Sequence, residues 1–206
     1  MSLEENTAVH LHKDDKASKL GMWLFLLTEL TLFGGLFLMY AVYRFTHQAE
    51  FHIAAKSLNT FIGTLNTSIL LTSSLTMALS ITAIRKGNKN LSLSFQGITI
   101  FFGLLFLLNK YFEWSHEINI GNFPGSESLL SKSQGEILFY GLYYVMTGLH
   151  ALHVIIGMIV IAVMMRFTMK NIINRNDNFK LEAAGLYWHL VDIIWIFLFP
   201  LFYLIS

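Results

Sequence analysis

The stretch Ile137-Leu-Phe-Tyr-Gly-Leu-Tyr-Tyr-Val-Met-Thr-Gly-Leu-His150-Ala-Leu-His153-Val-Ile-Ile-Gly-Met-Ile-Val-Ile-Ala-Val-Met-Met165 decides the fold class, because it contains no Asp, Glu, Lys or Arg. A helix rises about 1.5 Å per residue, and the hydrocarbon core of a bilayer is about 30 Å thick. About 20 apolar residues therefore cross it. This stretch is longer than that, so we expect it to cross the membrane with tilt or with a turn in water.

Four more stretches of similar character lie on both sides of this one. A β-barrel is a poor alternative, because its strands alternate apolar and polar residues over about ten positions, whereas these stretches are continuously apolar. The sequence predicts an all-α integral membrane bundle, with a polar tail over residues 1–19 and a single domain over residues 20–206. The five predicted transmembrane helices are residues 20–43, 58–84, 91–114, 135–165 and 181–206.

The composition excludes several other classes of protein. Hydrophobic residues make up 54% of the 206 residues and charged residues only 13%, where a soluble domain has about 25%. The net charge of +1 argues against a nucleic-acid-binding protein, which needs a basic face. With no cysteine, a metal or redox cofactor would have to be held by other side chains such as His or Met.

The distribution of basic residues predicts the orientation, because short cytoplasmic loops are enriched in Lys and Arg. Ten of the 14 basic residues lie in the tail, the second connection and the fourth connection, which share one side of the membrane. We expect the N-terminus in the cytoplasm and the C-terminus outside. The four basic residues assigned to the outer side are Arg44, Lys56, Lys110 and Lys132.

Five ionisable residues lie deep inside the predicted helices. An ionisable group in a bilayer costs several kcal/mol, so it usually faces the protein and has a partner or a function. Counted along the helices, the depths overlap, which predicts a polar layer joining the first, fourth and fifth spans. The five residues are Glu29, His150, His153, His189 and Asp192.

Each of these residues has a functional and a structural interpretation. Glu29 is either a proton-handling carboxyl or a neutral acid bonded to a neighbouring helix or a lipid. His150 and His153 share a helix face and are expected to be packing histidines, since a metal site needs a third ligand such as His189 or Asp192. His189 and Asp192 have the same spacing, which allows the carboxylate to orient the imidazole. No metal site is predicted.

Two further features are interpreted as structural, and two others mark a possible lipid contact and a loop. Lys110 and Glu113 are one turn apart and are expected to neutralise each other. In the second span Asn59, Asn66, Ser73 and Ser80 recur every seven residues, a stripe typical of close helix packing in lipid. Arg166, at the predicted cytoplasmic end of the fourth span, is a candidate contact for a phospholipid head group. The segment from Ser115 to Gln134 is predicted to be the longest loop.

These motifs together resemble subunit III of the haem-copper oxidases, the cytochrome c oxidase subunit III family, in its five-helix bacterial form. The resemblance covers nearly all of the chain after the tail. It rests on Lys19-Leu-Gly-Met-Trp-Leu-Phe-Leu-Leu-Thr-Glu29, on Leu65-Asn-Thr67 followed by Leu71-Thr-Ser-Ser74, on Thr147-Gly-Leu-His-Ala-Leu-His-Val-Ile-Ile-Gly157, and on Glu182-Ala-Ala-Gly-Leu-Tyr-Trp-His-Leu-Val-Asp-Ile-Ile-Trp195. Glu29 falls on the carbodiimide-reactive carboxyl of the family, whereas Lys110 departs from its pattern.

The resemblance implies an accessory, non-catalytic subunit of a proton-translocating cytochrome c oxidase in the bacterial inner membrane. It implies that haem and copper belong to partner subunits and that this chain binds neither. The chain would contact catalytic subunit I, subunit II and phospholipids, stabilise subunit I during oxygen reduction, and support proton uptake. Alternative functions are a quinol oxidase subunit III or an accessory protein of nitric oxide reductase. Remote alternatives are a b-type haem anchor and a proton-coupled transporter.

Overall fold

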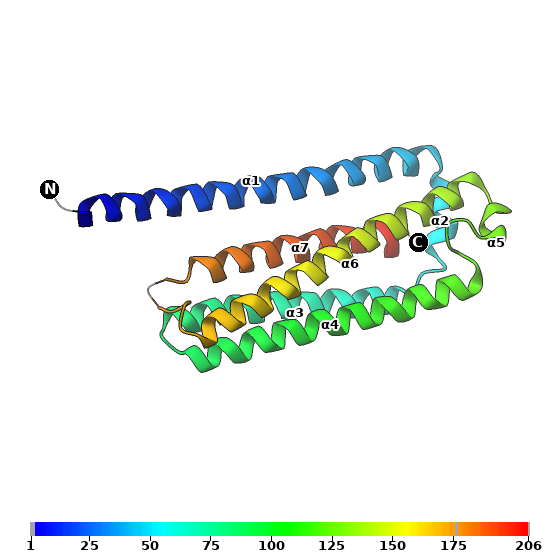
Figure 1. Ribbon diagram of the computed structural model, residues 1–206. Helices are drawn as coiled ribbons and strands as arrows, with labels where there is room; N and C mark the ends of the chain where they lie inside the picture. Colours follow the sequence, from blue (N-terminus) through cyan, green and yellow to red (C-terminus); the bar gives the residue numbers. More distant parts are fainter. Residues whose placement is uncertain (1–2, 176, 206) are drawn as a thin grey trace. The chain divides into compact units, whose positions relative to one another are not determined.

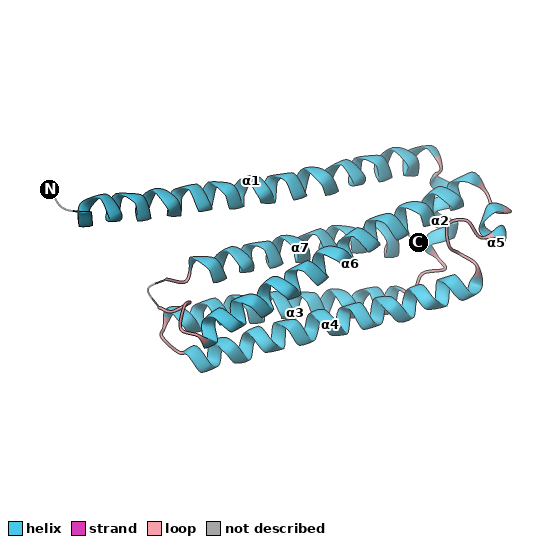
Figure 2. Ribbon diagram, in the orientation of Figure 1, coloured by secondary structure: helices cyan, strands magenta, loops and turns pink. Residues whose placement is uncertain are grey.

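A computed structural model describes residues 3–175 and 177–205, and these residues are almost entirely helical (Figure 1). Figure 2 shows helices joined by loops, with no strand in either described range. The all-α prediction is therefore confirmed. The helices are α1 (Leu3–Thr46), α2 (Gln48–Ala55), α3 (Thr60–Arg85), α4 (Lys89–Ile120), α5 (Glu127–Leu130), α6 (Gln134–Met169) and α7 (Phe179–Tyr203).

Five segments are long and apolar enough to cross a membrane: Ala17–Thr46, Thr60–Arg85, Lys89–Ile120, Gln134–Met169 and Phe179–Tyr203. They agree with the five predicted spans, apart from shifts at their ends, and make the chain a multi-pass membrane protein. Ser206, the last residue of the predicted fifth span, lies outside the described residues.

The chain divides into two units, with the boundary between Leu38 and Met39 inside α1. In the first unit, α1 begins at Leu3, so most of the predicted polar tail is continuous with the first apolar span. Residues 1 and 2 of that tail lie outside the described residues. The tail has no Gly or Pro up to Leu20 and is rich in Ala, Leu, Glu and Lys, which favour helices.

The second unit contains a four-helix bundle (Figure 1). Helix α3 packs against α4 and α7, and α6 packs against the same two helices, so that the four form a closed ring of contacts. The short helix α2 packs on α6 through its buried face of Phe51, Ala54 and Ala55. The largest buried side chains of the bundle include Trp188, Trp195 and Phe106.

The predicted seven-residue stripe on α3 is confirmed as a helix contact at three of its four positions. Asn66 accepts a hydrogen bond from Asn109 on α4 (2.9 Å), Ser73 accepts one from the Trp188 indole on α7 (2.8 Å), and the Ser80 hydroxyl lies 3.1 Å from that of Ser92. Small polar residues allow helices to approach closely and to bond across the contact. Asn59 instead caps the N-terminus of α3.

The connections contain helical structure that the charge pattern did not predict. Helix α4 continues to Ile120, six residues beyond the predicted end, and stops at Gly121, whose positive φ of 87° suits a residue without a side chain. The predicted loop from Ser115 to Gln134 is therefore shorter than expected and also holds α5. The additional residues of α4 were predicted to belong to a loop because they include the charged residue Glu117. The Glu117 side chain is, however, buried and accepts a hydrogen bond from Asn122 (2.9 Å).

Candidate functional site

The most elaborate polar site lies inside the four-helix bundle. It consists of Lys110 and Glu113 on α4, Tyr143 on α6 and Tyr203 at the end of α7, and we call these four residues the lysine–tyrosine cluster. All four side chains are buried. Lys110 Nζ lies 3.2 Å from Glu113 Oε2, one turn along the same helix.

The hydrogen bonds of the cluster form closed rings. Lys110 Nζ donates to the Tyr143 and Tyr203 hydroxyl oxygens, at 3.0 Å each. The Tyr143 hydroxyl donates to Glu113 Oε1 at 2.6 Å, and the Tyr203 hydroxyl donates to the same oxygen. Each phenol therefore accepts from the ammonium group and donates to the carboxylate, which compensates the cost of burying both charges.

Aromatic faces complete the surroundings of the Lys110 ammonium group. Its Nζ lies 4.9 Å from the ring centroid of Tyr143, 5.5 Å from Trp195 and 5.7 Å from Tyr203, all within range of a cation–π attraction. The cluster links α4 to α6 and α7. Its chemistry suits a fixed connection between helices, because the proton donors and acceptors of the cluster bond one another.

His150 lies next to this cluster in an aromatic environment. Its ring is fully buried, packs edge-on against Phe106 at 5.5 Å and lies 5.1 Å from Trp195. Within the described part of the chain, neither ring nitrogen of His150 has a hydrogen-bond partner. His153, one turn further on, has Nδ1 2.7 Å from the Leu149 carbonyl oxygen, so this nitrogen carries the proton. The two histidines thus have different surroundings.

The hydrogen bond that the spacing of His189 and Asp192 allows is not formed. His189 Nδ1 lies 2.5 Å from the Ser74 hydroxyl of α3, and neither Asp192 oxygen has a hydrogen-bond partner among the described residues. The reason is that α3 packs against this face of α7, so a hydroxyl from another helix takes the position expected for the carboxylate. Asp192 itself is buried.

The other predicted site residues lie apart from the cluster in the sequence. Glu29 lies on α1, between Thr28 and Thr31, whose hydroxyls donate to the carbonyl oxygens of Phe25 and Leu27 on the same helix. The threonine protons are therefore already used within α1. Arg166 is exposed in the last turn of α6.

The described residues contain no group of three or more His, Asp or Glu side chains placed to hold a metal ion.

The sequence predicted that Lys110 and Glu113 pair, but it did not identify Tyr143, Tyr203 and Ser74 as polar partners. The sequence contains only a weak signal for Tyr143 and Tyr203. Both lie in apolar helices, and the hydroxyl group of a buried tyrosine usually needs a hydrogen-bond partner.

These features define a multi-pass helical membrane protein whose buried polar groups mainly bond one another. A family model described as cytochrome c oxidase subunit III matches residues 3–206. The chain belongs to this family, and the resemblance stated above is confirmed.

Individual relatives agree with this assignment. The chain is 34% identical to cytochrome c oxidase subunit 3 of Synechocystis, over 90% of this chain and 74% of that protein. It is 29% identical to cytochrome bo(3) ubiquinol oxidase subunit 3 of Pseudomonas aeruginosa, over 96% and 89%. It is also 32% identical to heme-copper oxidase subunit I+III of Aeropyrum pernix, over 89% of this chain but only 22% of that longer protein.

Proposed function

We propose that this chain is the third, non-catalytic subunit of a bacterial cytochrome c oxidase. The observation that carries the proposal is the family match over residues 3–206, on a chain with five apolar helices that are each long enough to span a membrane. Cytochrome c is preferred over quinol as the electron donor of the complex because the chain is more similar to the Synechocystis cytochrome c oxidase subunit than to the ubiquinol oxidase subunit of Pseudomonas aeruginosa.

The proposed partners are catalytic subunit I and subunit II. The Aeropyrum pernix relative is named subunit I+III, which supports direct contact between a subunit of this family and a subunit I. Many apolar side chains on the helix surfaces are exposed, including Leu38, Phe101 and Ile159. Such faces suit lipid and helices of other subunits.

Haem and copper are proposed to reside in the partner subunits. A haem iron in this chain would need a buried His with an open approach, yet His150 is enclosed by Phe106 and Trp195, and His153 uses Nδ1 on a carbonyl oxygen. The contribution of this chain is then to stabilise subunit I and to support proton uptake into a proton-translocating complex. Glu29 and Asp192 are the two carboxyls proposed to support this proton uptake, Glu29 as a structural acid of α1 and not as a group that itself carries the proton. Arg166 is a proposed lipid contact.

Copurification tests the proposal. The chain is expressed with an affinity tag in its host, solubilised in mild detergent and purified, with an untagged strain as the control. We expect copurified haem, visible in a reduced-minus-oxidised difference spectrum, and oxygen consumption with reduced cytochrome c. Faster oxygen consumption with a quinol would favour the quinol oxidase function instead.

The chain expressed alone provides the opposite test. We expect no Soret absorption from it and no proton-coupled uptake of solutes by vesicles that contain only this chain. A Soret band lost in His150→Ala would support a b-type haem anchor and overturn the proposal.

A further inference from the structure

An open pocket of about 330 Å³ lies between α3 and α7. Arg85, at the end of α3, and Glu182, in the first turn of α7, line the pocket and form an ion pair there. His189 also lines it, about 15 Å along α7 from the first helical residue, Phe179. The pocket therefore reaches from the ends of two helices to a histidine inside a membrane span. The other lining residues are Ala78, Ile81, Thr82 and Leu186.

His189 connects this pocket with the interior of the bundle. Its Nδ1 lies 2.5 Å from the Ser74 hydroxyl of α3. The Ser74 hydroxyl also lies beside the Asp192 carboxyl, in a contact that falls short of a hydrogen bond. Asp192 is one turn beyond His189 on the same face of α7. The three side chains therefore form a series that begins at the pocket and ends at a buried carboxyl.

Two tryptophans lie one turn before and one turn after Asp192 on α7. The Trp188 indole N–H donates to the Ser73 hydroxyl (2.8 Å), and the Trp195 indole N–H donates to the Thr67 hydroxyl (3.1 Å). Both N–H groups are therefore used on α3, and none of the described side chains donates a well-formed hydrogen bond to Asp192. An ionised carboxylate is costly in such a place, because it is buried and lacks donors, so the carboxyl holds a proton.

We propose that Asp192 is a proton-storage site, which exchanges its proton with the aqueous phase through Ser74, His189 and the pocket. In the inward direction a proton binds to His189 Nε2, since an imidazole can take up a proton on one nitrogen and release one from the other. The proton on Nδ1 passes to Ser74 Oγ while the original Ser74 hydroxyl proton passes to the Asp192 carboxylate. The net change is the transfer of one proton from the pocket to Asp192, and the reverse sequence restores the first histidine tautomer.

The position of the pocket indicates where this proton comes from. The end of α3 and the start of α7 adjoin the second and fourth connections of the chain, and the basic residues predict both connections on the cytoplasmic side. The use of the stored proton for uptake into an oxidase rests on the proposed function. The exchange itself does not, because it depends only on side chains of this chain.

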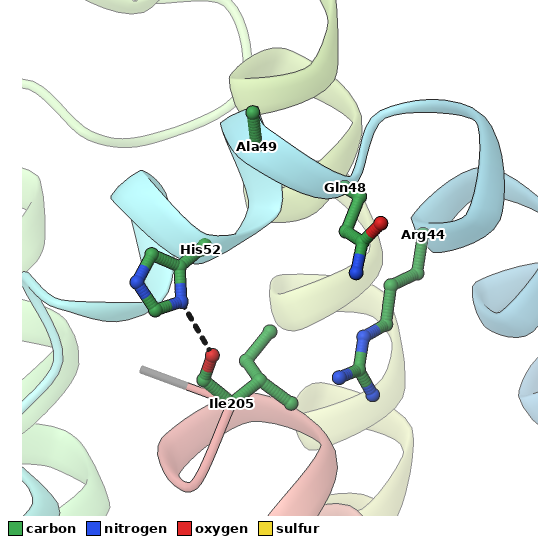
Figure 3. A pocket seen from close by; sticks show the side chains of 5 residues that line it. All are labelled: Arg44, Gln48, Ala49, His52 and Ile205. Carbon is green, nitrogen blue, oxygen red and sulfur yellow. Dashed lines mark hydrogen bonds between the residues drawn. The ribbon is translucent and has the colours of Figure 1, made fainter.

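A second histidine that lines a pocket provides a comparison. Figure 3 shows the His52 imidazole at an open pocket of about 390 Å³, with Nδ1 2.7 Å from the Ile205 carbonyl oxygen. A backbone carbonyl oxygen accepts a hydrogen bond but has no proton to pass on. None of the described residues that line this pocket carries a carboxyl group. His52 is thus a histidine at a pocket without the relay that begins at His189.

Infrared spectroscopy during exchange into D₂O tests the relay. The tagged chain is purified with whatever subunits accompany it, and the carbonyl band of protonated Asp192 is identified as the band that Asp192→Asn removes. We expect His189→Phe to retain this band but to slow its isotope shift by about a hundredfold, the usual scale for loss of a positioned proton-transfer group. The matched control is His52→Phe, which should exchange at the rate of the wild type.

Two further variants keep the proposal testable if His189→Phe disturbs the packing of α7. His189→Ala should also exchange slowly, and imidazole added to the buffer should restore the rate. Ser74→Ala removes the middle of the relay, and its control is Ser68→Ala, whose exposed hydroxyl bonds to the Thr64 carbonyl oxygen of the same helix.

Two results would overturn the proposal. One is that Asp192→Asn removes no carbonyl band, which means that Asp192 holds no proton. The other is that the band shifts as fast in the His189 and Ser74 variants as in the wild type. Because the band belongs to this chain, the measurement gives the same answer with or without copurified haem, so a wrong oxidase assignment is distinguished from a wrong relay.

Discussion

Lys110 and Glu113 form an ion pair inside a membrane-spanning helix bundle, with Nζ 3.2 Å from Oε2 and with 3% and 4% of the two side chains exposed. Arg85 and Glu182 form a closer pair, at 2.8 Å, but 58% and 30% of these side chains are exposed. The shorter distance does not make the second pair stronger. Solvent screens exposed pairs, whereas a buried charge that loses its partner cannot be solvated.

The first prediction compares single and double removal of the buried pair. Lys110→Met leaves the Glu113 carboxylate buried with only phenol partners, and should lower the free energy of unfolding by about 3–5 kcal/mol. Lys110→Met combined with Glu113→Gln should recover most of this loss, because the glutamine oxygen still accepts from Tyr143 and Tyr203. Unfolding of the purified complex, followed by tryptophan fluorescence, measures both.

The exposed pair serves as the control for this comparison. Arg85→Ala combined with Glu182→Gln should change the free energy of unfolding by less than about 1 kcal/mol. The free energy of unfolding lost in the buried double variant is compared with the sum of the losses in Lys110→Met alone and Glu113→Gln alone. If the two are equal, Lys110 and Glu113 are not coupled and the interpretation of the lysine–tyrosine cluster is wrong.

The second prediction concerns the tyrosine hydroxyls. Tyr203→Phe removes a group that accepts from Lys110 and donates to Glu113, so it should cost about 1.5–3 kcal/mol, the range for hydrogen bonds to charged groups. Tyr111→Phe on α4 is the matched control, because its side chain is 68% exposed and the change should stay within about 0.5 kcal/mol. Equal midpoints of thermal unfolding for the two variants would contradict the structural importance of the Tyr203 hydroxyl.

The membrane-spanning helices could be predicted because charge-free stretches are a local property of the sequence. Helix α2 and the end of α4 could not be predicted in this way. Glu117 looks like a loop residue in isolation, and only its bond to Asn122 and the position of Lys132, 2.8 Å from Asn122 Oδ1, explain its burial. Polar residues at a helix end resemble loop residues until their partners are known.

The candidate site could likewise be predicted only where its residues are close in the sequence. The pairing of Lys110 with Glu113 follows from a spacing of three residues, but Tyr203 is 90 residues from Glu113 in the sequence and gives no local signal. The equal spacing of His189 and Asp192 was misleading, since Ser74, 115 residues away, bonds to the imidazole instead. Spacing along one helix shows which groups can meet, whereas packing between helices decides which do.

The third prediction addresses Glu29, which we propose to be a structural acid of α1. Glu29→Gln keeps the size and an acceptor oxygen of the side chain, so oxygen consumption of the whole complex should remain close to that of the wild type. Proton ejection by the complex in vesicles is measured alongside it. Normal assembly with loss of proton pumping would instead assign Glu29 a direct part in proton transfer.

The fourth prediction uses two glycines of α6 that differ only in their surroundings. A Cβ at Gly157 would lie 2.7 Å from Cε3 of the Trp188 ring, which is buried and bonded to Ser73 and so has little freedom to move. Gly157→Ala should therefore destabilise the contact between α6 and α7 by about 1–3 kcal/mol. A Cβ at Gly141 meets nothing within 4 Å, so Gly141→Ala should stabilise α6 by about 0.5–1 kcal/mol, since alanine favours helix. We expect Gly157→Ala to lower the midpoint of thermal unfolding and Gly141→Ala to raise it. Equal shifts of the same sign would show that helix propensity, and not the close approach to Trp188, decides the effect at Gly157.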